Sequence, residues 1–142
     1  MKKITFIMLA LVAFVATSCS SGYSEDKCKE LCAKIEKGET LSQDDYTECI
    51  DQCDAILDEC KSKLESIQSK IDGKDENPAK LYDDFLRETS TMRGYLSTMS
   101  HALSDADLNS DNKAKIEGLK SKDKEVSNLR RTIREKSHWG ED

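Results

Sequence analysis

Apolar residues recur at intervals of three and four along most of the chain, a spacing that places them on one face of an α-helix. The longest run extends from Tyr46 to Ile71 as a single continuous stripe. Shorter runs with the same spacing precede and follow it, separated by polar stretches. The pattern predicts four helices, at about 25–37, 43–72, 78–104 and 112–137.

Residues that start and stop helices stand at the boundaries of these runs. Ser24 and Ser42 each precede acidic residues and are suited to be N-caps. Gly38 lies where a helix C-terminus takes a left-handed residue. Asn77 and Pro78 can restart the chain as an N-cap and a first helical residue. The connections between the predicted helices are therefore short.

Three long helices with short connections predict an antiparallel up-down-up bundle. The expected fold class is all-α: a disulfide-stapled helical hairpin continuing into an antiparallel three-helix bundle, in a single domain over 25–137 with a tail at 138–142. An extended coiled-coil rod and an oligomer of helical hairpins are the alternatives. Gly94 lies inside the third predicted helix, where it costs about 1 kcal/mol relative to alanine, and we expect it to permit a close helix crossing.

The chain begins with a short, mainly apolar segment behind two lysines. This segment, residues 4–16, has 13 residues. That is the length of a signal-peptide hydrophobic region and falls short of the ~20 residues that span a bilayer. A buried N-terminal helix or an ordinary membrane anchor is the alternative.

The segment ends in Ala16-Thr17-Ser18-Cys19, which resembles the lipobox of bacterial lipoproteins in the looser form of the Bacteroidota. The serines that follow also resemble that form, while Ala16 stands where the usual pattern has leucine. The resemblance implies a signal peptide over 1–18, a lipid on Cys19 and a tether over 19–24. It also implies export and anchoring to the outer membrane, on its periplasmic or its surface side.

Without residues 1–18 the chain has 124 residues, with 20 basic and 28 acidic side chains and a formal charge of −8. An acidic surface repels phosphate backbones, which argues against a nucleic-acid partner. Leucine, isoleucine, valine and phenylalanine make up about 16% of these residues, below the ~20% at which highly charged chains risk disorder. Such a chain needs strong periodicity or cross-links to fold.

Four cysteines form two Cys-x3-Cys pairs on either side of the first predicted turn: Cys28, Cys32, Cys49 and Cys53. Cysteines four residues apart lie on one face of a helix. If the two helices are antiparallel, opposed residues have numbers that add up to a constant. A single value of this sum pairs Cys28 with Cys53 and also pairs Cys32 with Cys49. In an oxidising compartment we therefore predict these two disulfides, and closing the inner loop should contribute about 3 kcal/mol.

This spacing resembles the twin Cys-x3-Cys hairpin of the small Tim chaperones of mitochondria, whose cysteines pair in the same nested way. We interpret the likeness as convergence and infer no chaperone function from it. The alternative for the four cysteines is a zinc or copper(I) site on two helices.

Cys60 has no counterpart in this register, and Cys53 is too far along the same helix to bond with it. We expect Cys60 to be an unpaired, buried residue. An intermolecular disulfide or a reactive thiol is the alternative.

The third connection contains four oxygen-bearing residues in alternation: Asp105, Asp107, Asn109 and Asp111. Their spacing resembles the first ligand positions of an EF-hand loop. Ser110 stands where that loop has glycine, and Ile116 stands where it has a bidentate glutamate. We expect a solvated turn, with a calcium site as the alternative.

The two histidines, His101 and His138, are expected at a helix end and in the tail. Trp139 is expected to pack on the end of the bundle, with a partner or membrane anchor as the alternative. No Ser/His/Asp grouping, phosphate loop or histidine cluster is visible in the sequence. We therefore predict no catalytic residues and no cofactor, and do not expect an enzyme.

Together these patterns favour a non-enzymatic, lipid-anchored cell-envelope protein that acts as a protein-binding or structural module. We expect it to contact the membrane through Cys19 and to have another protein as partner. A homo-oligomer formed through Cys60 or the helix faces is an alternative. The rival class is an exported thiol-based metal-binding or redox module built on the four paired cysteines.

Overall fold

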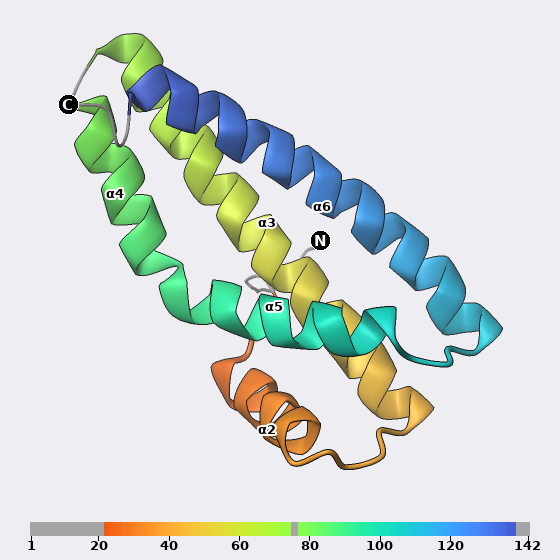
Figure 1. The fold of residues 1–142 in the computed structure, drawn as a ribbon. Helices are drawn as coiled ribbons and strands as arrows, with labels where there is room; N and C mark the ends of the chain where they lie inside the picture. The colour runs from red at the N-terminus through yellow and green to blue at the C-terminus, as the bar shows by residue number, and fades with distance from the viewer. Residues whose placement is uncertain (1–21, 75–76, 139–142) are drawn as a thin grey trace, which may run out of the picture.

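The computed structural model describes residues 22–74 and 77–138, and every regular element in them is an α-helix. The all-α prediction is therefore confirmed for this part of the chain (Figure 1). The proposed signal peptide, Cys19 and Trp139 lie outside the described residues. The helices are α2 (Glu25–Glu36), α3 (Gln43–Gly73), α4 (Pro78–Glu88), α5 (Ser90–Ser104) and α6 (Ser110–Ser137).

The predicted helix boundaries are set by the capping residues expected from the sequence. The Ser24 side chain accepts a hydrogen bond from the Lys27 amide, and Asn77 caps α4 ahead of Pro78. Ser42 forms a reciprocal capping box with Asp45 at the start of α3. Gly38 has a φ of +73°, as a glycine after a helix C-terminus commonly does.

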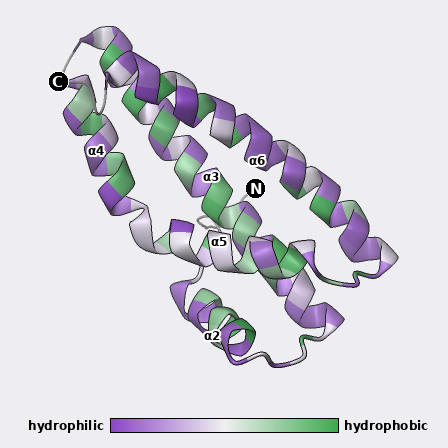
Figure 2. Ribbon diagram, viewed as in Figure 1, coloured by the Kyte–Doolittle hydropathy of each residue, from purple (hydrophilic) through white to green (hydrophobic). Residues whose placement is uncertain are grey.

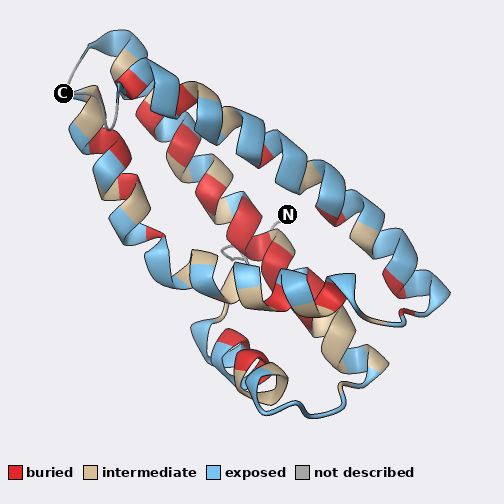
Figure 3. Ribbon diagram, viewed as in Figure 1, coloured by how far each residue is buried: buried red, intermediate tan, exposed pale blue. Residues whose placement is uncertain are grey.

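The bundle runs up, down and up, with α3 in the middle. Starting from α3, the chain returns along α4 and α5 and then runs back as α6 in the same direction as α3 (Figure 1). The core gathers along α3, which carries more buried positions than any other described helix, whereas α6 is mainly hydrophilic and mainly exposed (Figures 2 and 3). The buried positions of α6 are largely a heptad series: Asn112, Leu119, Val126 and Ile133.

Ion pairs join α3 to α6 along their length, in a seam of constant offset. The pairs Asp51–Lys115 at 3.0 Å, Lys61–Glu125 at 3.1 Å and Asp72–Lys136 at 3.3 Å are each 64 residues apart. Lys122 lies 2.8 Å from both Asp54 and Asp58. A constant difference means that the two helices are parallel and in register over the whole of their common length.

The predicted helix over 78–104 is wrong at one point, because it is broken at Thr89 into α4 and α5. The Thr89 side chain is fully buried, and its hydroxyl donates to the Phe85 carbonyl at 2.7 Å. The Arg93 guanidinium donates to the Thr89 hydroxyl and to the Leu86 carbonyl, at 2.9 and 2.7 Å. A threonine bonded back to the preceding turn bends a helix, and the arginine satisfies the carbonyl that the bend releases.

The bend directs α5 across α3 to meet α2. The backbone of α5 packs against α2 and α3, and no Cα atom of α5 lies within 8 Å of a Cα atom of α6. The close helix crossing expected at Gly94 is also wrong, because a Cβ atom placed there would meet nothing within 4 Å.

Candidate functional site

The four paired cysteines gather at the junction of α2, α3 and α5. All are buried, and the Cys28, Cys49 and Cys53 side chains are fully so. The Cys28 thiol donates to the Gln52 side-chain oxygen at 3.4 Å, and the Cys32 thiol donates to the Tyr95 carbonyl at 3.9 Å. Through these contacts the two thiols of α2 join this helix to α3 and to α5.

Burial makes these thiols hard to ionise. It raises the pKa of Cys28 to about 11, and the neighbouring Cys32 contributes further. It raises the pKa of Cys49 to about 12, again with a contribution from Cys32. The pKa of Cys53 is raised to about 12 by burial and by Cys49, against the effect of a hydrogen bond with Ser100. At neutral pH the thiols are therefore protonated and poor nucleophiles.

The predicted disulfides Cys28–Cys53 and Cys32–Cys49 are not formed in this structure, in which all four cysteines are free. The hairpin itself is antiparallel, as Lys27 lies 3.4 Å from Glu48 and Lys34 lies 3.3 Å from Asp45. The assumed register would have placed Lys27 opposite Asp54. In this structure α2 packs on α5 as well as on α3, so its position is not determined by the hairpin alone.

The same cysteines do not form a metal centre in this structure. Within residues 22–74 and 77–138, no three histidine, cysteine, aspartate or glutamate side chains are grouped so that they could hold a metal ion. The acidic side chains of the connection between α5 and α6 likewise form no such group among the described residues.

Residues of this connection make contacts that position the start of α6. Asn109 is the N-cap of α6, and its side chain accepts a hydrogen bond from the Asn112 amide at 2.9 Å. The Asp107 carbonyl accepts a hydrogen bond from the Gln43 side chain at 2.9 Å. Asp105 lies 3.9 Å from His101, and both side chains are highly exposed. This connection therefore fixes the start of α6 instead of gathering ligands.

Two buried amides that the sequence did not single out organise the ends of the helices. Gln52 accepts from the Ser24 amide at 2.8 Å and donates to the Gly22 carbonyl at 2.9 Å. Asn112 accepts from the Thr47 hydroxyl at 2.8 Å and donates to the Gln43 carbonyl at 3.2 Å. In a sequence, a buried amide gives the same signal as an exposed one.

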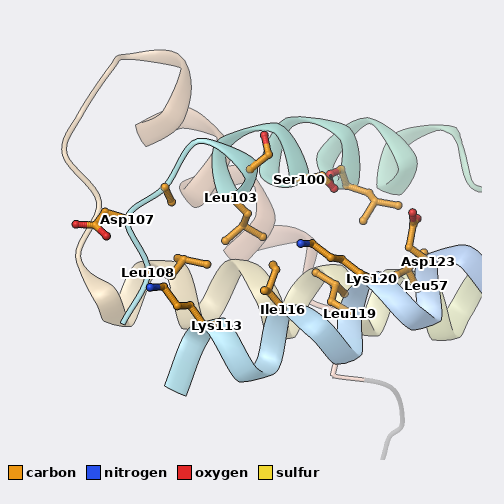
Figure 4. A pocket seen from close by; sticks show the side chains of 13 residues that line it. Leu57, Ser100, Leu103, Asp107, Leu108, Lys113, Ile116, Leu119, Lys120 and Asp123 are labelled. Carbon is orange, nitrogen blue, oxygen red and sulfur yellow. Dashed lines mark hydrogen bonds between the residues drawn. The ribbon is translucent and has the colours of Figure 1, made fainter. Parts of the chain in front are cut away.

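A groove opens between α5 and α6, where the bend at Thr89 has separated the two helices. Its larger part has a volume of about 580 Å³ and is mainly apolar (Figure 4). The floor is Leu57 of α3, and the apolar walls come from α5, the following connection and α6. The apolar lining residues of this part are Leu57, Leu96, Leu103, Ala106, Leu108, Ile116 and Leu119.

The groove continues along α6 into a second part of about 310 Å³. The two parts share Leu57, Leu96, Ser100 and Asp123, and the second extends over Cys60. The expectation of a buried Cys60 is confirmed, since its side chain is 3% exposed. Burial also raises the pKa of this thiol.

Two charged residues that interrupt the apolar stripe of α6, Asp123 and Arg130, line this groove. In the sequence these two residues appear only as charged positions within an otherwise apolar stripe. Their placement depends on the departure of α5, which comes from a tertiary arrangement around Thr89. The groove was therefore not visible from periodicity alone.

No protein-family model matches the chain, and no curated protein or solved structure matches it significantly. None of the helices in the described residues is long and apolar enough to cross a membrane. The fold and the groove are therefore interpreted from their own chemistry.

Proposed function

We propose that this chain is a non-enzymatic, lipid-anchored cell-envelope protein that acts as a binding or structural module, with another envelope protein as its expected partner. The observation that carries the proposal is the open groove between α5 and α6. Its walls are mainly apolar, and its volume is that of a ligand site.

The chemistry around the groove supports binding more than catalysis. Its polar lining consists of serines, lysines, arginines and aspartates, and it contains neither histidine. The one cysteine in it, Cys60, is buried and has a raised pKa, which makes it a poor nucleophile at neutral pH. The lipobox-like segment supports an anchor at Cys19 and hence a location in the envelope.

The rival function, a thiol-based metal-binding or redox module, has less support. Such a module needs accessible thiolates or convergent ligands, whereas the paired thiols are buried and their pKa values are raised.

We further propose that the hairpin becomes cross-linked after export. A dithiol oxidase would accept two electrons and two protons for each bond formed, closing Cys28–Cys53 and Cys32–Cys49. Because these cysteines are free in the structure, α2 and α3 would have to shift relative to each other to form the bonds, at some cost in the contacts between α2 and α5. Two such bonds would add a covalent clamp to a chain with a small apolar core.

The clamp predicts a specific thiol count. Protein purified from the envelope and denatured with alkylating reagent should have one modified cysteine, Cys60, among the five of residues 22–138, and reduction should release the other four. Peptide mapping by mass spectrometry identifies the partners. Five free thiols in envelope-derived protein would contradict the clamp.

The proposed function is tested in cells with a photocross-linking amino acid. One variant carries it at Ser104, an exposed residue of the groove, and a matched control carries it at Ser66, an exposed residue of α3 that lines none of the groove. We expect one defined adduct from Ser104 and none from Ser66. The Cys19→Ala variant should leave the membrane fraction and lose metabolic labelling with palmitate.

Equal adducts from both positions, or none from either, would contradict a groove-centred binding function. Palmitate labelling that survives Cys19→Ala would contradict the anchor.

A further inference from the structure

Solvent reaches the apolar lining of the groove only in part, and this restricts what can contact it. Most of its apolar lining side chains have little contact with solvent: Leu57 is 3% exposed, Leu103 is 4% exposed and Leu119 is 8% exposed. A helix about 10 Å wide could touch only the rim of such a groove. A ligand that reaches these side chains must be thin.

The groove is also long. Its two parts share residues near Leu57 and together follow α6 from Lys113 to Arg130. At 1.5 Å per residue this stretch of helix measures about 26 Å. A thin and linear apolar group has the proportions to occupy it, whereas a compact ring system would fill only one part.

The charges at the rim favour an anion. The charged lining residues are Arg93, Lys113, Lys120 and Arg130 on the basic side and Asp107 and Asp123 on the acidic side. This excess of positive charge is local, because the whole chain has a formal charge of −6. In Figure 4, Lys120 extends across the groove toward Leu103, while Asp107 points away from it.

From these observations we propose that the groove binds the linear acyl chain of an anionic amphiphile. The chain lies over Leu57 between α5 and α6, and the anionic group lies among the basic side chains of the rim. This inference rests on the proposed function in taking the groove as the binding site, and it names the chemistry of the ligand. A free fatty acid and the acyl group of a lipid-modified protein both carry this chemistry.

Calorimetric titration of the mature chain with laurate, below its critical micelle concentration, tests the proposal. We expect saturable binding to one site with a negative heat-capacity change, as for apolar burial. Dodecylammonium, which has the same chain and the opposite charge, should bind about tenfold more weakly because of the basic rim. An N-dodecanoyl acidic peptide distinguishes the sources: if it binds more tightly than laurate, the acyl group of a modified protein is the ligand.

Two tryptophan substitutions on α5 localise the site. Leu96→Trp fills the groove where its two parts join and should weaken laurate binding at least tenfold. Met92→Trp, on the same helix and outside the lining of either part, should leave binding unchanged. Thermal melting followed by circular dichroism checks that both variants fold. If Leu96→Trp fails to fold, Ile116→Trp on the opposite wall takes its place.

The proposal is overturned if laurate does not bind, if dodecylammonium binds as tightly as laurate, or if both tryptophan variants lose binding equally. Absence of laurate and lipopeptide binding together with a defined adduct at Ser104 would overturn the acyl-chain inference and leave the proposed function standing. Laurate binding without any adduct at Ser104 would support the acyl-chain inference and overturn the protein partner of the proposed function.

Discussion

Two buried side-chain amides, Gln52 and Asn112, fix the ends of three helices. Gln52 is 2% exposed and holds the segment before α2 against α3, next to Cys53. Asn112 is 1% exposed and joins the first turn of α6 to the first turn of α3. A buried amide that loses its partners costs about 1–3 kcal/mol, so each favours one placement of its helix over its alternatives.

The buried thiols predict a loss of stability at alkaline pH in the reduced protein. Unfolded thiols ionise near pH 8.5, whereas burial keeps the pKa of Cys49 and Cys53 at about 12 in the folded state. The folded pKa is the higher one, so the contribution to stability is complete below about pH 8.5 and falls as the pH rises toward 12. Urea titrations under reducing conditions at a series of pH values measure this fall.

The control for this prediction is the Cys49→Ala/Cys53→Ala variant. It should be less stable at neutral pH because of lost packing, but its free energy of unfolding should decline less steeply above pH 9. An equally steep decline would mean that other groups cause the loss.

At the scale of single helices, the sequence predicted the helix starts, which have a local cause, and missed the bend, which depends on tertiary packing. The caps Ser24, Ser42 and Asn77 act within a few residues, and each begins the helix that the sequence assigned to it. The bend at Thr89 was missed because the apolar spacing continues through it. Its cause is a buried hydroxyl and the guanidinium of Arg93, and burial cannot be read from a threonine in a sequence.

Glycine substitutions provide a test at this scale. Gly94→Ala should stabilise the protein by about 1 kcal/mol, because the site is inside α5 and a Cβ atom meets nothing there. Gly38→Ala should destabilise it by about 1 kcal/mol, since alanine is strained at a φ of +73°. Thermal melts of both variants decide the matter. A destabilising Gly94→Ala would indicate a close contact in solution.

At the scale of the molecule, the up-down-up path followed from helix lengths and short connections, but the relation of α2 to the bundle did not. The constant-sum rule considers only the two helices of the hairpin, whereas α2 also contacts α5. The four paired cysteines lie buried on the two helices that the sequence predicted to be antiparallel. Their pairing could not be settled from spacing, because spacing says nothing of the angle at which two helices cross.

The α3–α6 seam predicts a salt-dependent contribution to the stability of the bundle. Burial alone would lower the pKa of Lys122, but its hydrogen bonds to Asp54 and Asp58 outweigh this and raise it. Lys122→Gln should lower the free energy of unfolding by about 1 kcal/mol at low ionic strength, and by less in high salt. Lys124→Gln, at an exposed position, is the matched control and should have no measurable effect in urea titrations at both ionic strengths.

The constant offset of 64 residues between α3 and α6 also determines which changes of length the chain can absorb. One residue inserted inside either helix would rotate all later positions by about 100° and separate every following pair. One residue inserted in the connections after α3 or α5 would leave each pair intact. Variation in length among relatives of this protein should therefore collect in those two connections, whereas a matched insertion of seven residues in the long helices would extend the molecule without disturbing its seam.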